Sequence, residues 1–130
     1  TVVATSPRLA DGTPFPTLYY LTHPAATAAM SQLEATQVMV EFSELLESDA
    51  DVAADYRAAH ESFIADRESF AVVPELANIS AGGMPTRVKC LHALAGHALS
   101  VGPGINPIGD LALERSTWKS TVCACLDYGI

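Results

Sequence analysis

The chain has 130 residues, of which 49% are hydrophobic and 17% are charged, a balance that fits one soluble globular domain with a single core. Its formal net charge is −8, and seven lysines and arginines are too few for a basic surface that binds nucleic-acid phosphates. No apolar run approaches the roughly 18 to 20 residues that cross a bilayer, and no segment resembles a signal peptide. We therefore expect a cytoplasmic protein with neither a nucleic-acid nor a membrane partner.

Two short β-prone segments open the chain. Residues 2–6 and 16–21 are rich in Val, Thr and Tyr, and the Asp11-Gly12 pair between them is a turn signal. This pattern predicts an N-terminal β-hairpin.

Three helical segments follow the hairpin. Pro24 suits the first turn of a helix, and a change of hydrophobic phase near residues 35–37 predicts a break before a second helix that begins near Val38. The clearest helix begins after Ser48 or Asp49, either of which can cap it. Its apolar stripe consists of Val52, Tyr56, Ala59, Phe63 and Phe70.

Most of the negative charge lies in these helices. Residues 34–75 contain eleven acidic residues against Arg57 and Arg67, a net charge of −9, whereas the other residues, five basic and four acidic, sum to +1. The simplest interpretation is a solvated helical face. The alternative is an acidic surface that docks a protein partner, which charge reversal of Glu41, Glu44 and Glu47 in a pull-down would test.

The stretch "SAGGMPTRVKCLHALAGHALSVGPG", residues 80–104, holds the densest chemistry of the chain. Pro85 and Gly102 predict a helix between them, followed by a loop over residues 103–110 and a last short helix. Glycines before a helix leave backbone amides at the positive end of its dipole, which favours an anion. We predict a site for a small, phosphate-like anion at Gly82, Gly83, Arg87, Lys89, Asn106 and Asp110. The alternative is that the glycines only form the turn and the cations are solvated.

A metal site is a second interpretation of the same stretch. On a regular helix His92 lies about 200° from Cys90, and His97 lies two turns away from Cys90, so the three cannot share one small ion. Cys90 and His92 can act together only in an irregular or terminal turn, or with ligands from other segments. The available partners are His23, Cys123 and Cys125. Four N or S ligands of this kind would suit zinc. The alternative is a small buried thiol and core histidines.

A third interpretation is enzymatic. A small metal-dependent or thiol hydrolase could use Cys90, His92 and His97, but no nucleophile elbow or papain-type cysteine environment surrounds them. The sequence therefore favours a binding protein over an enzyme.

Three segments carry a family resemblance: "DGTPFPTLYYLTHP", "YRAAHES" and "SAGGMPTRVKCLHALAGHALSVGPGINPIGD". Together they resemble the bacterial domain of unknown function 501 family, common in actinobacteria, over about Val2 to Leu113. The final "STWKSTVCACLDYGI" departs from the family pattern. We expect a single family domain over residues 1–115 and an atypical tail over residues 116–130.

The resemblance implies a candidate protein partner and candidate metal ligands, but no activity. Members resemble small cytoplasmic proteins encoded beside a septum-formation initiator and an exopolyphosphatase of the Ppx/GppA type, which suggests such a phosphatase as a partner. Many members carry Cys at the position of His23, and a Cys-containing turn before the first strand. This exchange suits a zinc ligand and makes Cys90, His92 and His23 the candidates in this chain.

These observations predict a mainly helical α+β domain in which an N-terminal β-hairpin packs on three to four helices. The function that we expect is that of an accessory or regulatory binding module.

Overall fold

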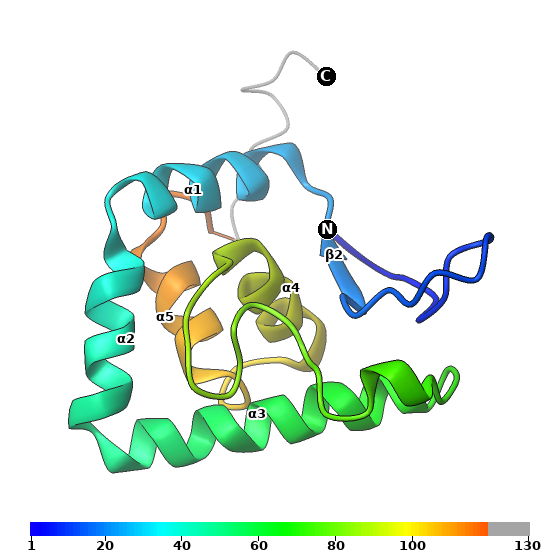
Figure 1. Ribbon diagram of the computed structural model, residues 1–130. Coiled ribbons are helices and arrows are strands. Elements are labelled where there is room, and N and C mark those ends of the chain that lie inside the picture. The colour runs from blue at the N-terminus through cyan, green and yellow to red at the C-terminus, as the bar shows by residue number, and fades with distance from the viewer. Residues whose placement is uncertain (120–130) are drawn as a thin grey trace.

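A computed structural model describes residues 1–119. Its elements are β1 (Val2–Ala4), β2 (Tyr19–Leu21), α1 (Pro24–Ala35), α2 (Val38–Ser48), α3 (Ala50–Glu68), the 3-10 helix η1 (Pro74–Leu76), α4 (Leu91–Val101) and α5 (Pro107–Arg115). The predicted fold class, a mainly helical α+β domain with an N-terminal hairpin, is confirmed. Figure 1 shows α1, α2 and α3 along three sides of a frame that surrounds α4 and α5. No helix among residues 1–119 is long and apolar enough to span a bilayer.

The hairpin is shorter than predicted and lies against α4. β1 and β2 are antiparallel, with Val2 opposite Leu21, and each strand has three residues. Proline has no backbone N–H to donate to a ladder, so regular pairing does not extend through Pro16. The strand β2 approaches α4 closely at Gly96, where a Cβ atom would lie 3.2 Å from the Tyr19 carbonyl oxygen.

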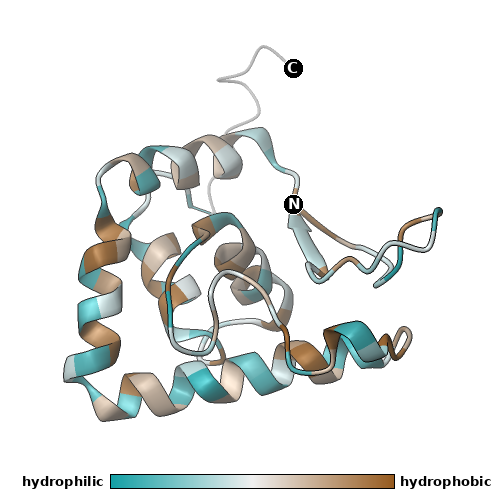
Figure 2. Ribbon diagram, in the orientation of Figure 1, coloured by the Kyte–Doolittle hydropathy of each residue, from teal (hydrophilic) through white to brown (hydrophobic). Residues whose placement is uncertain are grey.

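The central helix α4 supplies much of the core. Seven of its eleven residues are buried, and its small residues let the neighbouring elements come close. Gly109 of α5 faces the Leu94 carbonyl so closely that a Cβ atom there would overlap the oxygen. Figure 2 shows the contrast with α3, along which hydrophilic and hydrophobic residues alternate. Hence α4 is enclosed, whereas α3 turns one face to solvent.

The helix α3 confirms most of its predicted stripe. Tyr56, Ala59 and Phe63 are buried, and Asp49 caps the helix by accepting hydrogen bonds from the amides of residues 51 and 52. The prediction for Phe70 was wrong: the helix ends at Glu68, and Phe70 is 59% exposed. Arg67, one of the two basic residues counted in the acidic segment, is only 2% exposed.

Two predicted helix starts also need correction. The helix expected from Pro85 begins at Leu91, because the amides of residues 89 and 90 donate to the Gly82 carbonyl instead of to carbonyls one turn back. The loop expected over residues 103–110 is helical from Pro107, since the Asn106 side chain caps α5 by accepting from the amide of residue 109.

The resulting irregular segment, residues 77–90, is fastened by side chains from two helices. His60 Nδ1 lies 2.6 Å from Ser80 Oγ, and Tyr56 donates its hydroxyl to the Arg87 carbonyl at 2.8 Å. At the end of the segment, the amide of Leu91 donates to Glu34 of α1. We call this the fastened segment below.

The start of the predicted tail packs on the domain. Trp118 is 8% exposed, and its ring lies 5.5 Å from the ring of His23. Cys123 and Cys125, which the sequence offered as metal ligands, lie outside the described residues.

Candidate metal centre

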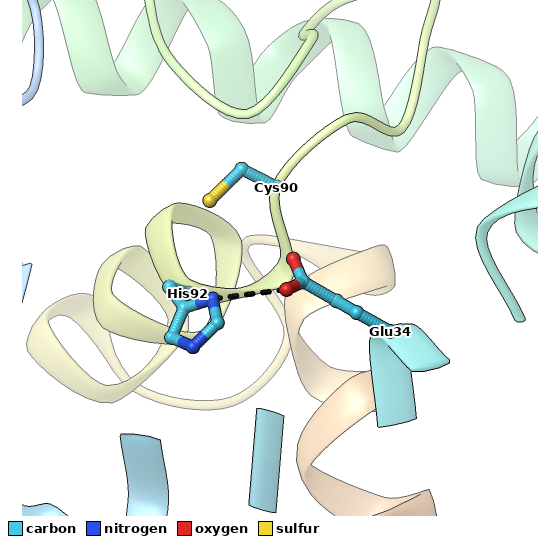
Figure 3. A group of neighbouring side chains, drawn as sticks. All are labelled: Glu34, Cys90 and His92. Atoms are coloured by element: carbon cyan, nitrogen blue, oxygen red, sulfur yellow. Dashed lines mark ion pairs between the residues drawn. The ribbon is translucent and has the colours of Figure 1, made fainter. Parts of the chain in front are cut away.

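Three side chains of different chemistry converge beside the first turn of α4. Glu34 comes from the last turn of α1, Cys90 is the N-cap of α4, and His92 lies in its first turn. One ligand atom from each lies within 4.8 Å of the other two, and all three residues are half-buried (Figure 3). Tetrahedral zinc ligands lie about 3.5 Å apart, so a movement of about 1 Å would bring these atoms onto one ion.

The position of Cys90 explains why the pair comes together. Its backbone is extended (φ −141°, ψ 107°), so Cys90 precedes the helix, and the spacing of 100° per residue does not apply between it and His92. This is the terminal turn that the sequence required for the two residues to act together.

Glu34 is held by both of its oxygen atoms. The amide of Leu91 donates to Oε2 at 2.9 Å, and Oε1 lies 3.3 Å from His92 Nδ1. A carboxylate is favoured at this place, because the N-terminus of a helix carries a partial positive charge and unpaired N–H groups. The chain thus places its own anion at the start of α4.

The orientation of His92 is fixed by its other nitrogen. Nε2 lies 3.1 Å from the Thr27 carbonyl oxygen and 3.2 Å from Ser31 Oγ. A carbonyl can only accept, so we assign the proton to Nε2. In a neutral imidazole this leaves a lone pair on Nδ1, which faces the acceptor oxygen of Glu34. Two acceptors at this distance require a proton or a metal ion between them.

The sequence-predicted ligand His23 lies elsewhere. It is the N-cap of α1, and its Nδ1 accepts a hydrogen bond from the amide of Ala25 at 3.1 Å. The group of converging ligands therefore holds Cys90 and His92 with Glu34, and His23 is not part of it.

Comparison with known proteins identifies the family of this chain. A family model described as "Protein of unknown function (DUF501)" matches residues 1–114. The chain belongs to the DUF501 family. No curated protein and no solved structure matches it. The predicted family is thereby confirmed, and what this DUF501 protein does has to be argued from its own geometry.

His97, the other histidine of α4, is a core residue of this DUF501 protein. It is fully buried, with its ring stacked on Tyr19 at 5.9 Å and edge-on to Phe63 at 5.3 Å. The Asn106 oxygen accepts from the α5 backbone, so its amide nitrogen donates to His97 Nδ1 at 3.1 Å. His97 Nε2 then carries the proton and lies buried, without a partner among the described residues. His97 is therefore separate from the converging ligands.

We expect His97 to make the fold sensitive to acid. Burial lowers its pKa from 6.5 to about 4, so between these values the unfolded chain takes up a proton that the folded chain does not. The stabilisation is complete above pH 6.5 and decreases as the pH falls toward 4, with a slope of up to about 1.4 kcal/mol per pH unit. Urea unfolding between about pH 7 and pH 4 measures this slope, and His97→Gln should reduce it. Equal slopes for both proteins would contradict the prediction.

The structure gives the residues of the predicted anion site different roles, mostly as hydrogen-bond partners within loops. The carbonyls of Gly82 and Gly83 accept hydrogen bonds within the fastened segment, and neither glycine lies at a helix N-terminus. Asp110 accepts from the amide of Gly104 at 2.9 Å. The side chains of Arg87 and Lys89 are exposed to solvent. The premise of glycine amides at the start of a helix was therefore wrong, because α4 begins eight residues later.

Sequence reasoning missed Glu34 as a site residue. It was counted only as the first member of the acidic segment, and Leu91, which it contacts, follows it by 57 positions. No motif of local spacing joins the two. The signal that could have found it is chemical: a carboxylate in the last turn of α1, where no helix dipole favours it.

Proposed function

We propose that this DUF501 protein binds a divalent metal ion, with zinc as the best match, through the Glu34 carboxylate, the Cys90 thiolate and His92 Nδ1. The observation that supports it is the Glu34 Oε1 oxygen 3.3 Å from His92 Nδ1, with the Cys90 sulfur within 4.8 Å of both ligand atoms. Zinc accepts this combination of oxygen, sulfur and nitrogen ligands.

Outer hydrogen bonds support this assignment. Metal-binding histidines usually donate their second nitrogen to a carbonyl or carboxylate, and ligating carboxylates are themselves hydrogen-bonded. Here His92 Nε2 faces the Thr27 carbonyl, and Glu34 Oε2 accepts from the Leu91 amide. Both groups direct their remaining ligand atom toward the same place.

The three protein ligands found among residues 1–119 leave a position for water or another molecule. An ion with such a position can polarise a carbonyl or lower the pKa of a bound water, whereas a structural zinc site has four protein ligands. We therefore propose a binding module with an accessible metal. The hydrolase interpretation named Cys90, His92 and His97 and stays a prediction, although His97 lies in the core, apart from the other two.

Metal titration of matched variants tests the proposal. The background is Cys123→Ser/Cys125→Ser, which removes the thiols outside the described residues. On this background we expect one Zn²⁺ or Co²⁺ per chain, with a cobalt–thiolate charge-transfer band. Cys90→Ser should abolish the band, and His92→Gln and Glu34→Gln should each weaken binding by at least about tenfold. The Gln at position 34 still accepts from Leu91, so this change removes the charge and keeps the cap.

The control is His23→Gln, because His23 is a histidine at a helix start outside the ligand group. It should bind metal as the background protein does. Metal binding that survives Cys90→Ser and His92→Gln together, or no binding at all, would contradict the proposal. In that case a shared proton would account for the contact between His92 and Glu34.

The other interpretations stay predictions. Arg87 and Lys89 are exposed and could meet a small anion, and Arg87→Ala should then weaken phosphate binding without loss of the fold. Glu41, Glu44 and Glu47 are also exposed, which suits either a solvated face or the docking of a protein such as a Ppx/GppA-type phosphatase.

A further inference from the structure

A cavity of about 340 Å³ lies between β2 and α4, next to the proposed metal ligands. Two of these ligands, Cys90 and His92, line it. The other lining residues are Thr17, Tyr19, Tyr20, Leu21, Thr27 and Ala93. Its volume falls within the range of about 300 to 1,000 Å³ that is usual for small-molecule sites.

The charges of this cavity select against an ionic ligand. Among the described residues, no Lys, Arg, Asp or Glu lines it. A divalent ion together with the Cys90 thiolate and the Glu34 carboxylate would have a net charge of zero. A charged molecule would lose part of its hydration in this half-open cavity and find no opposite charge to offset the loss. An uncharged ligand has no such cost.

The walls favour an apolar or aromatic body. Tyr20, Leu21 and Ala93 present ring and aliphatic surface, and the exposed Tyr20 ring lies at 6.4 Å from Phe15 in a stacked arrangement. Burial of apolar surface against such walls contributes binding free energy in proportion to the area removed from water.

We infer that this cavity binds a small, uncharged molecule with an aromatic or apolar body, whose oxygen-bearing head group takes the free position on the metal. The inference rests on the proposed function and deepens it by naming the class of ligand. It differs from the phosphate-like anion that the sequence alone suggested.

Carboxamides bound to the cobalt-loaded Cys123→Ser/Cys125→Ser protein test this inference, because their head group stays uncharged and coordinates through one oxygen. The probes are acetamide, benzamide and 4-carboxybenzamide, which share this head group and differ in body and charge. The visible cobalt spectrum reports binding of the head group. Benzamide should bind at least about tenfold more tightly than either of the others. The exposed Tyr20 can be changed without disturbing the core, and Tyr20→Ala should remove most of the preference over acetamide. Phe70→Ala, which alters an exposed ring outside the cavity, should leave it unchanged.

The outcomes separate the two proposals. The charge-transfer band is recorded before any probe is added, and its absence would overturn both the metal site and the ligand site. A normal band with equal binding of the three probes would overturn the ligand site alone. The same holds for a preference that Tyr20→Ala leaves intact.

Discussion

Replacing Arg67 with Met should lower the free energy of unfolding by about 2 to 4 kcal/mol, because it removes two hydrogen bonds from a buried charged donor and leaves the Pro16 carbonyl without a donor among the described residues. The Arg67 guanidinium donates to the carbonyls of Pro16 at 3.0 Å and Leu76 at 2.7 Å. It also lies over the Phe63 ring, 5.9 Å from its centroid. One side chain of α3 thus holds both the segment before β2 and the 3-10 helix.

Urea unfolding measures this loss, and Arg57→Met is the matched control. Arg57 lies on the same helix but is exposed, so its replacement should change stability by less than about 0.5 kcal/mol. Arg67→Lys should be destabilising too, because an ammonium group lacks the fork that reaches two carbonyls. If Arg57→Met costs as much as Arg67→Met, the two hydrogen bonds are not the reason.

The second large effect should follow Gly109→Ala, with a loss of about 2 to 3 kcal/mol. Helix propensity alone predicts the opposite sign, since Ala is favoured over Gly inside a helix by about 1 kcal/mol. The added Cβ would overlap the Leu94 carbonyl oxygen and lie 2.9 Å from the Ala98 Cβ atom. Backbone and a short side chain cannot move aside as the end of a flexible side chain can, so α5 would be displaced from α4.

Gly96→Ala provides a graded comparison for this effect. The Cβ atom there would lie 3.2 Å from the Tyr19 carbonyl oxygen, a tight contact that a small shift of β2 can relieve. Thermal or urea unfolding should show a smaller loss than for Gly109→Ala. Stabilisation by Gly109→Ala would show that α4 and α5 do not cross as closely as described.

The elements that could be predicted from the sequence depend on local signals. The cap at Asp49, Pro24 in the first turn of α1 and the change of phase near Gln37 each act within a few residues, and the structure bears them out. Gln37 has a left-handed backbone with φ 61°, which separates α1 from α2. The hydrophobic period placed the buried face of α3 for the same reason.

The features that escaped prediction depend on distant partners. Arg67 reads as a surface charge until the carbonyl of Pro16, 51 positions away, is brought beside it. The helix α4 begins at Leu91 and not at Pro85, because the amides just before and at its start donate to the Gly82 carbonyl and the Glu34 carboxylate. In a longer helix the same amides would donate to carbonyls of the helix itself. The chemistry of Cys90 and His92 was visible in the sequence, but Glu34 could be recognised only from the packing of α1 on α4.

The fastened segment has a consequence for recognition. Residues 77–90 contain no long regular element, yet His60, Tyr56 and Glu34 fix the segment or its exit into α4. A chain without such contacts would lose about 1 to 2 kcal/mol of conformational entropy per residue on being ordered by a ligand. Here that entropy is already lost when the protein folds. Cys90 thus stands on preorganised backbone, and a partner that meets it needs to overcome little more than its own loss of motion.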